Sequence, residues 1–282
     1  MNKINKLNLG GEIFDIKPNS INDLDDILSI EKGGTNADNY KDALANLHAA
    51  ETTTETLTYY VDANNGSDDN NGLTEGTAFK TIQHAIDILP KVIFHQIIIN
   101  CAEGTYEEDL IIEEFKGNGW LAIYGNNQDC SRHFINSLYC KNCSCDLIFQ
   151  GWTVTKSQQI ELTYYASIIA NHCTECNFYK LDFPKKDTSL QNGKLGSAIV
   201  IRNSSTAVIG NISAYEQQYA ILCIGASECQ LGMISGSGNE FGYYAGNESY
   251  IIAQNTLPTD FATTKYQKIT GGLVYAAGAL VT

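Results

Sequence analysis

The sequence predicts an all-β solenoid, in which many short strands wind into stacked coils. The composition is the first observation: 24 glycines, 16 tyrosines and only four prolines among 282 residues, with abundant Ile, Thr and Asn, are typical of short strands joined by Asn/Gly turns. The second is a repeat, because five segments align in one column at Cys145, Cys176, Ala207, Cys229 and Tyr250. One short coil takes about 21 residues, and the longer early intervals would carry side loops such as residues 183–194.

The N-terminal elements are small. Residues 1–17 alternate apolar and polar side chains around Gly10 and Gly11, which predicts a hairpin. Residues 20–30 have helical spacing behind a Ser20 cap, and residues 38–47 predict a second short helix after a two-glycine turn. Helices of this length are marginal alone in water, so we expect them to need partner chains.

Residues 32–49 resemble the GGT-containing motif in the stalks of bacteriophage tail fibres and tail-associated proteins, at Gly33, Gly34, Thr35, Ala43, Asn46 and Leu47. Asn36 and Ala45 depart from that pattern, where the family has a Gly-Ala pair and a basic residue. The resemblance implies that residues 1–49 form a virion-attachment and trimerisation region of a homotrimer. It also implies contacts with tail, baseplate or other virion proteins, assembly in the host cytoplasm and a location in the virion. A solvated turn and helix of no particular family is the alternative.

Residues 50–58 are rich in Thr and predict a linker, followed by a β-helix domain over 59–282 that ends in a cap or tip. Residues 59–62 predict a strand, 63–76 a turn-rich loop, and 78–89 an amphipathic helix that ends before Pro90. This order resembles the start of right-handed parallel β-helices of the pectin-lyase-like type, where a helix covers the open end of the stack. Residues 97–101 and the segment EGTYEEDLIIE resemble the first coil of that family. The apolar C-terminal segment is expected to pack on the final coil or on partner chains.

The charge balance and the hydropathy exclude several partners. The 32 acidic and 18 basic residues give a net charge of −14, the wrong sign for binding phosphate backbones, so no nucleic acid partner is predicted. No apolar run reaches the ~20 residues that cross a bilayer, and the N-terminus lacks a signal-peptide core, so no membrane insertion is predicted. Nine cysteines without a secretory signal indicate reduced thiols.

Two patterns suggest metal ligands, and both have simpler explanations. Two C-x-x-C pairs, at Cys140 and Cys173, have 29 residues between them, more than zinc pairs usually have, and their members fall in the repeat columns. The acidic loop 62–71 has the oxygen density of a calcium loop, but Ala78 stands where the twelfth-position Glu belongs, and Asx turns explain the loop. No metal and no cofactor are therefore predicted.

Glycan cleavage needs two facing carboxylates, which sequence spacing does not reveal. Carboxylates in or beside the repeats are Glu161, Asp182, Asp187, Glu216 and Glu240, but no hydrolase, phosphate-binding or metalloprotease motif is present, so no catalytic residue is predicted.

Aromatic rings suit sugar binding, because the apolar face of a sugar packs on a ring while polar neighbours bind its hydroxyls. The predicted ligand-binding residues are Trp152, Tyr164, Tyr165, Tyr215, Tyr243 and Tyr244. For each, a place in the core or at a contact between subunits is the alternative. The predicted function is that of a tail fibre or receptor-binding protein that attaches to host surface polysaccharide. The alternatives are a glycan depolymerase on the same fold and a purely structural baseplate or head decoration.

Overall fold

A computed structural model describes residues 6–9, 12–15, 37, 39–47, 51–126, 129–161, 164–185 and 196–281. The chain divides into two compact units, Met1–Glu51 and Thr52–Thr282. None of the helices in the described ranges is long and apolar enough to cross a membrane.

The first unit contains the predicted hairpin and the second predicted helix. Strands β1 (Lys6–Leu9) and β2 (Glu12–Asp15) pair antiparallel, with Leu7 opposite Phe14, which confirms the hairpin. Helix α1 (Tyr40–Asn46) begins after Asn39, whose Oδ1 accepts a hydrogen bond from the Asp42 N–H, as an N-cap does. The helix predicted over 20–30 and the turn at residues 33–35 lie outside the described residues.

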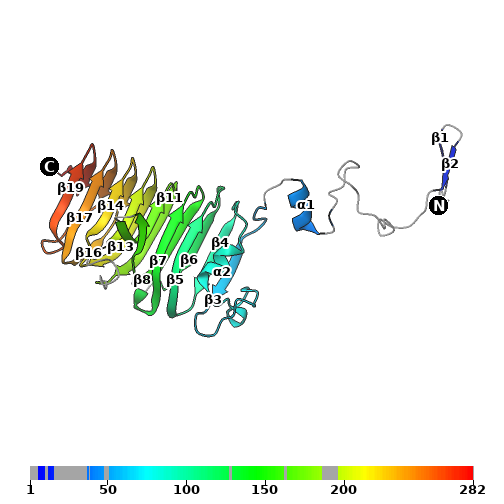
Figure 1. Cartoon of the computed structure of the whole chain (residues 1–282), viewed down its shortest axis with the longest axis horizontal. Helices are drawn as coiled ribbons and strands as arrows, with labels where there is room; N and C mark the ends of the chain where they lie inside the picture. The colour runs from blue at the N-terminus through cyan, green and yellow to red at the C-terminus, as the bar shows by residue number, and fades with distance from the viewer. Residues whose placement is uncertain are drawn as a thin grey trace. The chain divides into compact units, whose positions relative to one another are not determined.

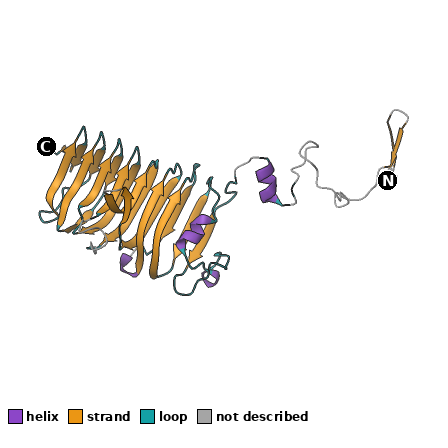
Figure 2. Ribbon diagram, in the orientation of Figure 1, coloured by secondary structure: helices purple, strands orange, loops and turns teal. Residues whose placement is uncertain are grey.

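The second unit is the predicted parallel β-helix (Figures 1 and 2). Strands dominate the part of the chain that the structure describes, and helices are few and short, so the fold is all-β. Ladder 1 consists of β3 (Leu57–Val61), β4 (Gln96–Cys101), β6 (Trp120–Tyr124), β8 (Asp146–Val154), β11 (Glu175–Phe183), β13 (Thr206–Tyr215), β15 (Glu228–Leu231), β18 (Tyr250–Ala253) and β20 (Leu273–Ala276). Ladder 2 consists of β5 (Gly104–Glu113), β7 (His133–Lys141), β10 (Tyr164–Asn171), β12 (Ser197–Arg202), β14 (Tyr219–Ile224), β17 (Asn239–Gly246) and β19 (Ala262–Ile269).

The other strands extend this framework. The second half of β13 pairs with β16 (Ile234–Ser237), while β9 (Gln158–Glu161) forms an antiparallel hairpin with β10. The last strand, β21 (Ala279–Leu280), pairs antiparallel with β20, and Val281 packs against the core. This confirms that the apolar C-terminal segment packs on the final coil.

The register corrects the predicted repeat column at two positions. Ladder 1 aligns Leu147, Cys176, Ala207, Cys229 and Ile251. Ile251, not Tyr250, therefore occupies the column. A one-residue shift moves a side chain to the other face of the strand, and accordingly Tyr250 is 45 % exposed whereas Ile251 is 0 % exposed. Cys145 lies two residues before its true counterpart and is also buried, so burial patterns do not reveal that error.

The β-helix unit begins earlier than predicted. Residues 52–58 are not a linker separate from it, because the Thr53 side chain is buried and its Oγ1 accepts a hydrogen bond from the Phe94 N–H at 2.9 Å. Thr52 also pairs with Val92 in an isolated parallel bridge. The Thr-rich composition predicted a solvated segment, but the Thr53 hydroxyl instead serves as the hydrogen-bond acceptor of the Phe94 backbone N–H.

The first coils are covered by α2 (Ile82–Asp87), which packs Ile82, Ala85 and Ile86 into the core (Figure 1). This helix is shorter than the predicted 78–89, because Phe79 N–H donates to the Tyr60 carbonyl and the chain there is still extended. The η3 turn (Glu75–Thr77) belongs to the preceding loop, and η4 (Cys130–Arg132) precedes β7.

The acidic loop before α2 contains the expected Asx turns. Asp62 Oδ1 accepts from the Asn64 and Asn65 N–H groups, and Asp68 accepts from the Lys80 N–H and from both the N–H and the hydroxyl of Thr81. Burial alone would raise the pKa of Asp68, but these hydrogen bonds outweigh it and lower the pKa below its ordinary value. These carboxylates therefore stabilise the turn by hydrogen bonding.

Seven of the nine cysteines are buried, and none of the nine forms a disulfide. Burial raises the pKa of Cys145 to about 12, so this thiol stays protonated at neutral pH. Within the described ranges, no group of three or more His, Cys, Asp or Glu side chains is arranged to hold a metal ion.

Candidate functional site

The outer face of ladder 1 carries the candidate site. In β6, Leu121 and Ile123 point into the core and are buried, so Trp120, Ala122 and Tyr124 face outward. The same alternation holds in β4, β8 and β11. Because the strands are in register, outward side chains of successive coils form rows that cross the strands.

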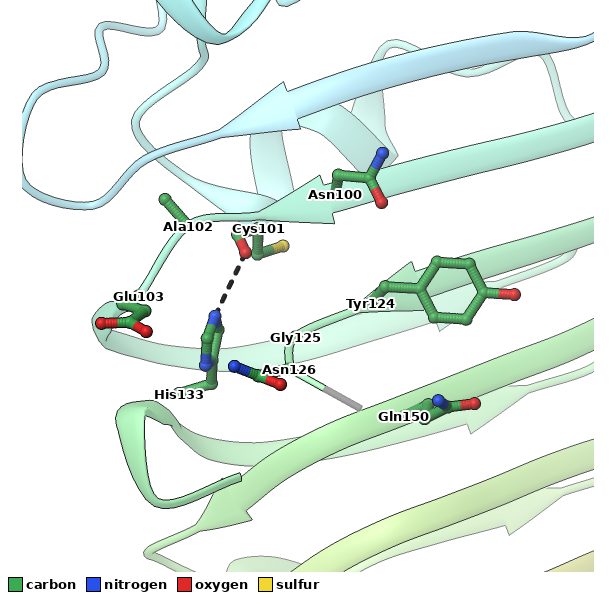
Figure 3. A pocket seen from close by; sticks show the side chains of 9 residues that line it. All are labelled: Asn100, Cys101, Ala102, Glu103, Tyr124, Gly125, Asn126, His133 and Gln150. Carbon is green, nitrogen blue, oxygen red and sulfur yellow. Dashed lines mark hydrogen bonds between the residues drawn. The ribbon is translucent and has the colours of Figure 1, made fainter. Parts of the chain in front are cut away.

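One of these rows alternates tyrosines with carboxamides, and we call it the tyrosine–amide row. Its members, all half-buried, are Tyr60, Asn100, Tyr124, Gln150 and Tyr179. Neighbouring strands lie ~4.8 Å apart, so successive tyrosines are about 10 Å apart and the row spans about 19 Å. Figure 3 shows its three central side chains projecting side by side from consecutive strands.

Three open depressions lie along this row. The one in Figure 3 has a volume of about 720 Å³, and Asn100, Tyr124 and Gln150 form its side towards the row. A second, of about 400 Å³, is lined by Tyr60 and Asn100, and a third, of about 660 Å³, by Tyr179. The row therefore connects hollows that begin on the first coils and continue along the stack.

The third depression exists because glycines follow Tyr179. Gly210 holds the next register position, and a Cβ there would lie 3.2 Å from Tyr179 Cδ1, so the glycine leaves room for the tyrosine ring. Gly232 continues the hollow, and the amides of Gln230 and Gln254 line it. This end of the row thus repeats the combination of an aromatic ring with carboxamides.

The groups around the first depression are polar and mostly uncharged. His133 Nε2 lies 3.2 Å from the Cys101 carbonyl oxygen, which can only accept, so Nε2 carries the proton. Burial lowers the pKa of His133 and favours the neutral ring, and burial raises the pKa of Tyr124, which stays a hydroxyl. At the rim, Arg132 forms an exposed ion pair with Glu103 at 2.9 Å. Uncharged donors and acceptors of this kind can form hydrogen bonds with hydroxyl groups.

A second row on the same face is acidic. The acidic row consists of Asp146, Glu175 and Glu228, with Thr206 between the last two. Burial and the neighbouring Glu175 raise the pKa of Asp146. Four residues along each strand separate this row from the tyrosine–amide row, which is about 13 Å. Between them runs a mostly apolar row, whose members include Ile98, Ile148 and Val208.

The structure places the six sequence-predicted binding residues elsewhere. Trp152 and Tyr243 are 0 % and 1 % exposed: Trp152 stacks on Phe149 with ring centroids 5.4 Å apart, and Tyr243 contacts Tyr266. Both occupy inward positions, so neither ring is open to a ligand. The core alternative therefore holds for these two, and they leave the candidate set.

The other four are not brought together with the row. Tyr215 is 39 % exposed at the end of β13, and Tyr165 is half-buried in β10. Tyr244 lies on the outer side of ladder 2, with its ring centroid 5.1 Å from that of Tyr219. The side chain of Tyr164 lies outside what the structure describes.

The carboxylates considered for cleavage are dispersed over both ladders. Burial raises the pKa of Asp182 in β11, Glu216 pairs with Lys185 at 2.6 Å, and Glu240 is exposed in β17. Asp187 and the side chain of Glu161 lie outside the described part of the chain.

Sequence reasoning missed the row because it selected aromatics near the repeats without separating inner from outer positions. Both tryptophans illustrate this: Trp152 is in the core, whereas Trp120 faces outward from β6. The available signal was the alternation in WLAIY, which places Trp120 and Tyr124 on one face and Leu121 and Ile123 on the other.

Comparisons with known proteins add little to this geometry. No family model and no curated protein matches the chain. A solved structure, the native GH136 lacto-N-biosidase from Eubacterium ramulus, is similar over 76 % of this chain and 68 % of that chain, with 9 % sequence identity and a TM-score of 0.28. A likeness of this degree carries no argument about function.

Proposed function

We propose that the β-helix is a carbohydrate-binding unit whose ligand lies along the tyrosine–amide row. The observation that carries the proposal is the alternation of three tyrosines with two carboxamides on one outer face, joined by three depressions. A tyrosine ring packs against the apolar face of a sugar, and carboxamides both donate to and accept from its hydroxyls. The tyrosine spacing of about 10 Å suits an extended chain that contacts a ring at every second sugar.

The wider role we propose is attachment to host surface polysaccharide as a receptor-binding protein of a bacteriophage tail. Support comes from the GGT-containing motif at residues 33–35 and the helix α1 that follows it. In this proposal the first unit contacts other virion proteins and three copies associate, so that three weak sites act together. Light scattering of the full chain is expected to give about three times its 30.9 kDa, and detection of the chain in purified virions tests the location.

The binding proposal is tested by alanine substitution along the row. Tyr60→Ala, Tyr124→Ala and Tyr179→Ala are each expected to weaken retention of the protein on a polysaccharide panel that includes host wall and capsular glycans. Loss of one ring contact, at about 0.5–1.5 kcal/mol, weakens the dissociation constant by about 2- to 12-fold. Tyr215→Ala is the matched control, because Tyr215 is exposed and lies off the row.

The same assay distinguishes the alternatives. Weaker retention for Tyr215→Ala, with the three row variants unchanged, would contradict the row as the site. Release of soluble oligosaccharides would identify a depolymerase rather than an adhesin. If the folded protein is retained on none of the glycans, the purely structural alternative is favoured.

A further inference from the structure

The charged side chains on the outer face of ladder 1 are mostly acidic. We infer that the ligand is an uncharged polysaccharide and that the acidic row weakens the binding of anionic polysaccharides to this face. This inference rests on the proposed function. The inference concerns the chemical class of the ligand, which the tyrosine–amide row alone does not fix, because tyrosines and carboxamides bind neutral and acidic sugars alike.

The first observation is the sign of the charges. Asp146, Glu175 and Glu228 project from the same face as the tyrosine–amide row, and Lys180 is the only lysine or arginine within the strands of ladder 1. A carboxylate or phosphate on a bound glycan would therefore meet mainly like charges across this face. Like charges at this range oppose binding unless salt screens them.

The second observation is that the acidic row reaches the depressions. Gln230 Nε2 donates to Glu228 Oε1 at 3.3 Å, and the same Gln230 lines the hollow beside Tyr179. A separate, smaller hollow of about 260 Å³ is bordered by both Glu175 and Glu228. The acidic side chains are thus adjacent to the proposed binding surface.

Two cations near the row need to be considered. Arg132 lies at the rim of the first depression, but it is paired with Glu103, so together they add no net charge. Lys180 follows Tyr179 at a corner of the coil with φ of +51°, outside the pairing register of the strands. One lysine at the edge does not offset three carboxylates.

Distance sets the salt range in which discrimination is visible. The rows are about 13 Å apart along the strands. The Debye length is ~30 Å at 0.01 M salt and ~10 Å at 0.1 M, so the acidic row acts fully at low salt and is largely screened at several hundred millimolar. Discrimination that disappears with salt is therefore the expected signature.

The test uses a chemically matched pair of probes. The retention assay first selects a neutral polysaccharide. The dissociation constants of the full chain for this polysaccharide and for its carboxymethylated derivative are then compared at 10 mM and 500 mM NaCl. We expect the dissociation constant of the carboxymethylated form to exceed that of the neutral form at least about tenfold at 10 mM NaCl. This ratio of dissociation constants is expected to fall to within about threefold at 500 mM NaCl.

Variants locate the effect. The double variant Glu175→Gln/Glu228→Gln is expected to lower the ratio of the two dissociation constants at 10 mM NaCl to less than half its wild-type value. The control Glu240→Gln/Glu248→Gln removes the same charge from exposed positions outside ladder 1, and its ratio is expected to stay within the error of wild type. This control matters because the whole chain carries a net charge of −14.

Three results would overturn the inference. The carboxymethylated form could bind as well as the neutral one at 10 mM, the ratio could persist unchanged at 500 mM, or the control variant could narrow it as much as the row variant. Failure of the proposed function is distinct from these, because then Tyr124→Ala would not weaken retention of the neutral probe either.

Discussion

Replacing Ser227 by alanine is expected to destabilise the β-helix, because this serine belongs to a buried column at one corner of the coils. The Ser227 Oγ accepts a hydrogen bond from the Ser205 N–H at 3.2 Å, and the Ser227 N–H donates to the Ser249 Oγ at 3.0 Å. In the preceding coil the Cys173 N–H donates to the Ser205 Oγ at 3.0 Å. All four residues are buried, so water does not replace a lost partner.

The magnitude follows from the group left without a partner. Ser227→Ala removes the acceptor of one buried N–H, which costs about 1–3 kcal/mol in the free energy of unfolding. With a urea dependence near 3 kcal/mol per molar for a chain of this size, the midpoint falls by about 0.3–1 M. Ser227→Cys is expected to lie between wild type and alanine, because Cys173 shows that a thiol fits this column and sulfur is a weak acceptor.

Urea unfolding followed by circular dichroism measures these midpoints. Ser235→Ala is the control, since its hydroxyl is exposed and donates to the Ile212 carbonyl, where water can substitute. We expect that control to change stability by less than about 0.5 kcal/mol. Equal midpoints for Ser227→Ala and Ser235→Ala would refute the claim that the column supports the coil stack.

Three further predictions concern other parts of the β-helix. Hydrogen bonds hold the pKa of Asp68 below its ordinary value, so its contribution to stability is present above about pH 4 and is lost as pH falls through the folded-state pKa. Asp68→Asn is expected to reduce the loss of stability between pH 5 and pH 2 in unfolding measurements. The same loss of stability in wild type and variant would contradict this role. The seven buried cysteines are expected to resist a thiol reagent in the native protein, so that at most the two half-buried ones, Cys101 and Cys130, react, whereas all nine react in denaturant. Rapid native labelling of more than two would contradict the burial. Gly210→Val is expected to displace the Tyr179 ring and weaken glycan retention about as much as Tyr179→Ala, and unchanged retention would exclude that hollow from the site.

The elements that follow from local chemistry could be predicted from the sequence, and those that depend on register could not. The hairpin and α1 formed where their periodicity placed them, and β4 and β5 formed where the resemblance to the first coil of a β-helix placed them. Helix α2 was predicted too long, because the apolar Phe79 fits a helical stripe equally well when it packs from an extended segment. Thr53 was predicted in a linker, because no local pattern shows that its hydroxyl accepts a hydrogen bond from the Phe94 N–H, about forty residues later and just before β4.

The candidate site depends on register more than any single element does. Tyr60, Tyr124 and Tyr179 become neighbours only because each coil contributes one outward position at the same height, and the coils contain side loops of different length. A one-residue error in any coil removes its member from the row and turns that side chain inward, as the misplacement of Tyr250 shows. The sequence predicted that aromatic rings in or beside the repeats contact a ligand, but only the pairing of strands shows which rings share a face. By the same reasoning, inserting one residue in β6 between Trp120 and Tyr124 should remove Tyr124 from the row while the chain keeps its aromatic content, which separates a binding face from mere aromatic abundance.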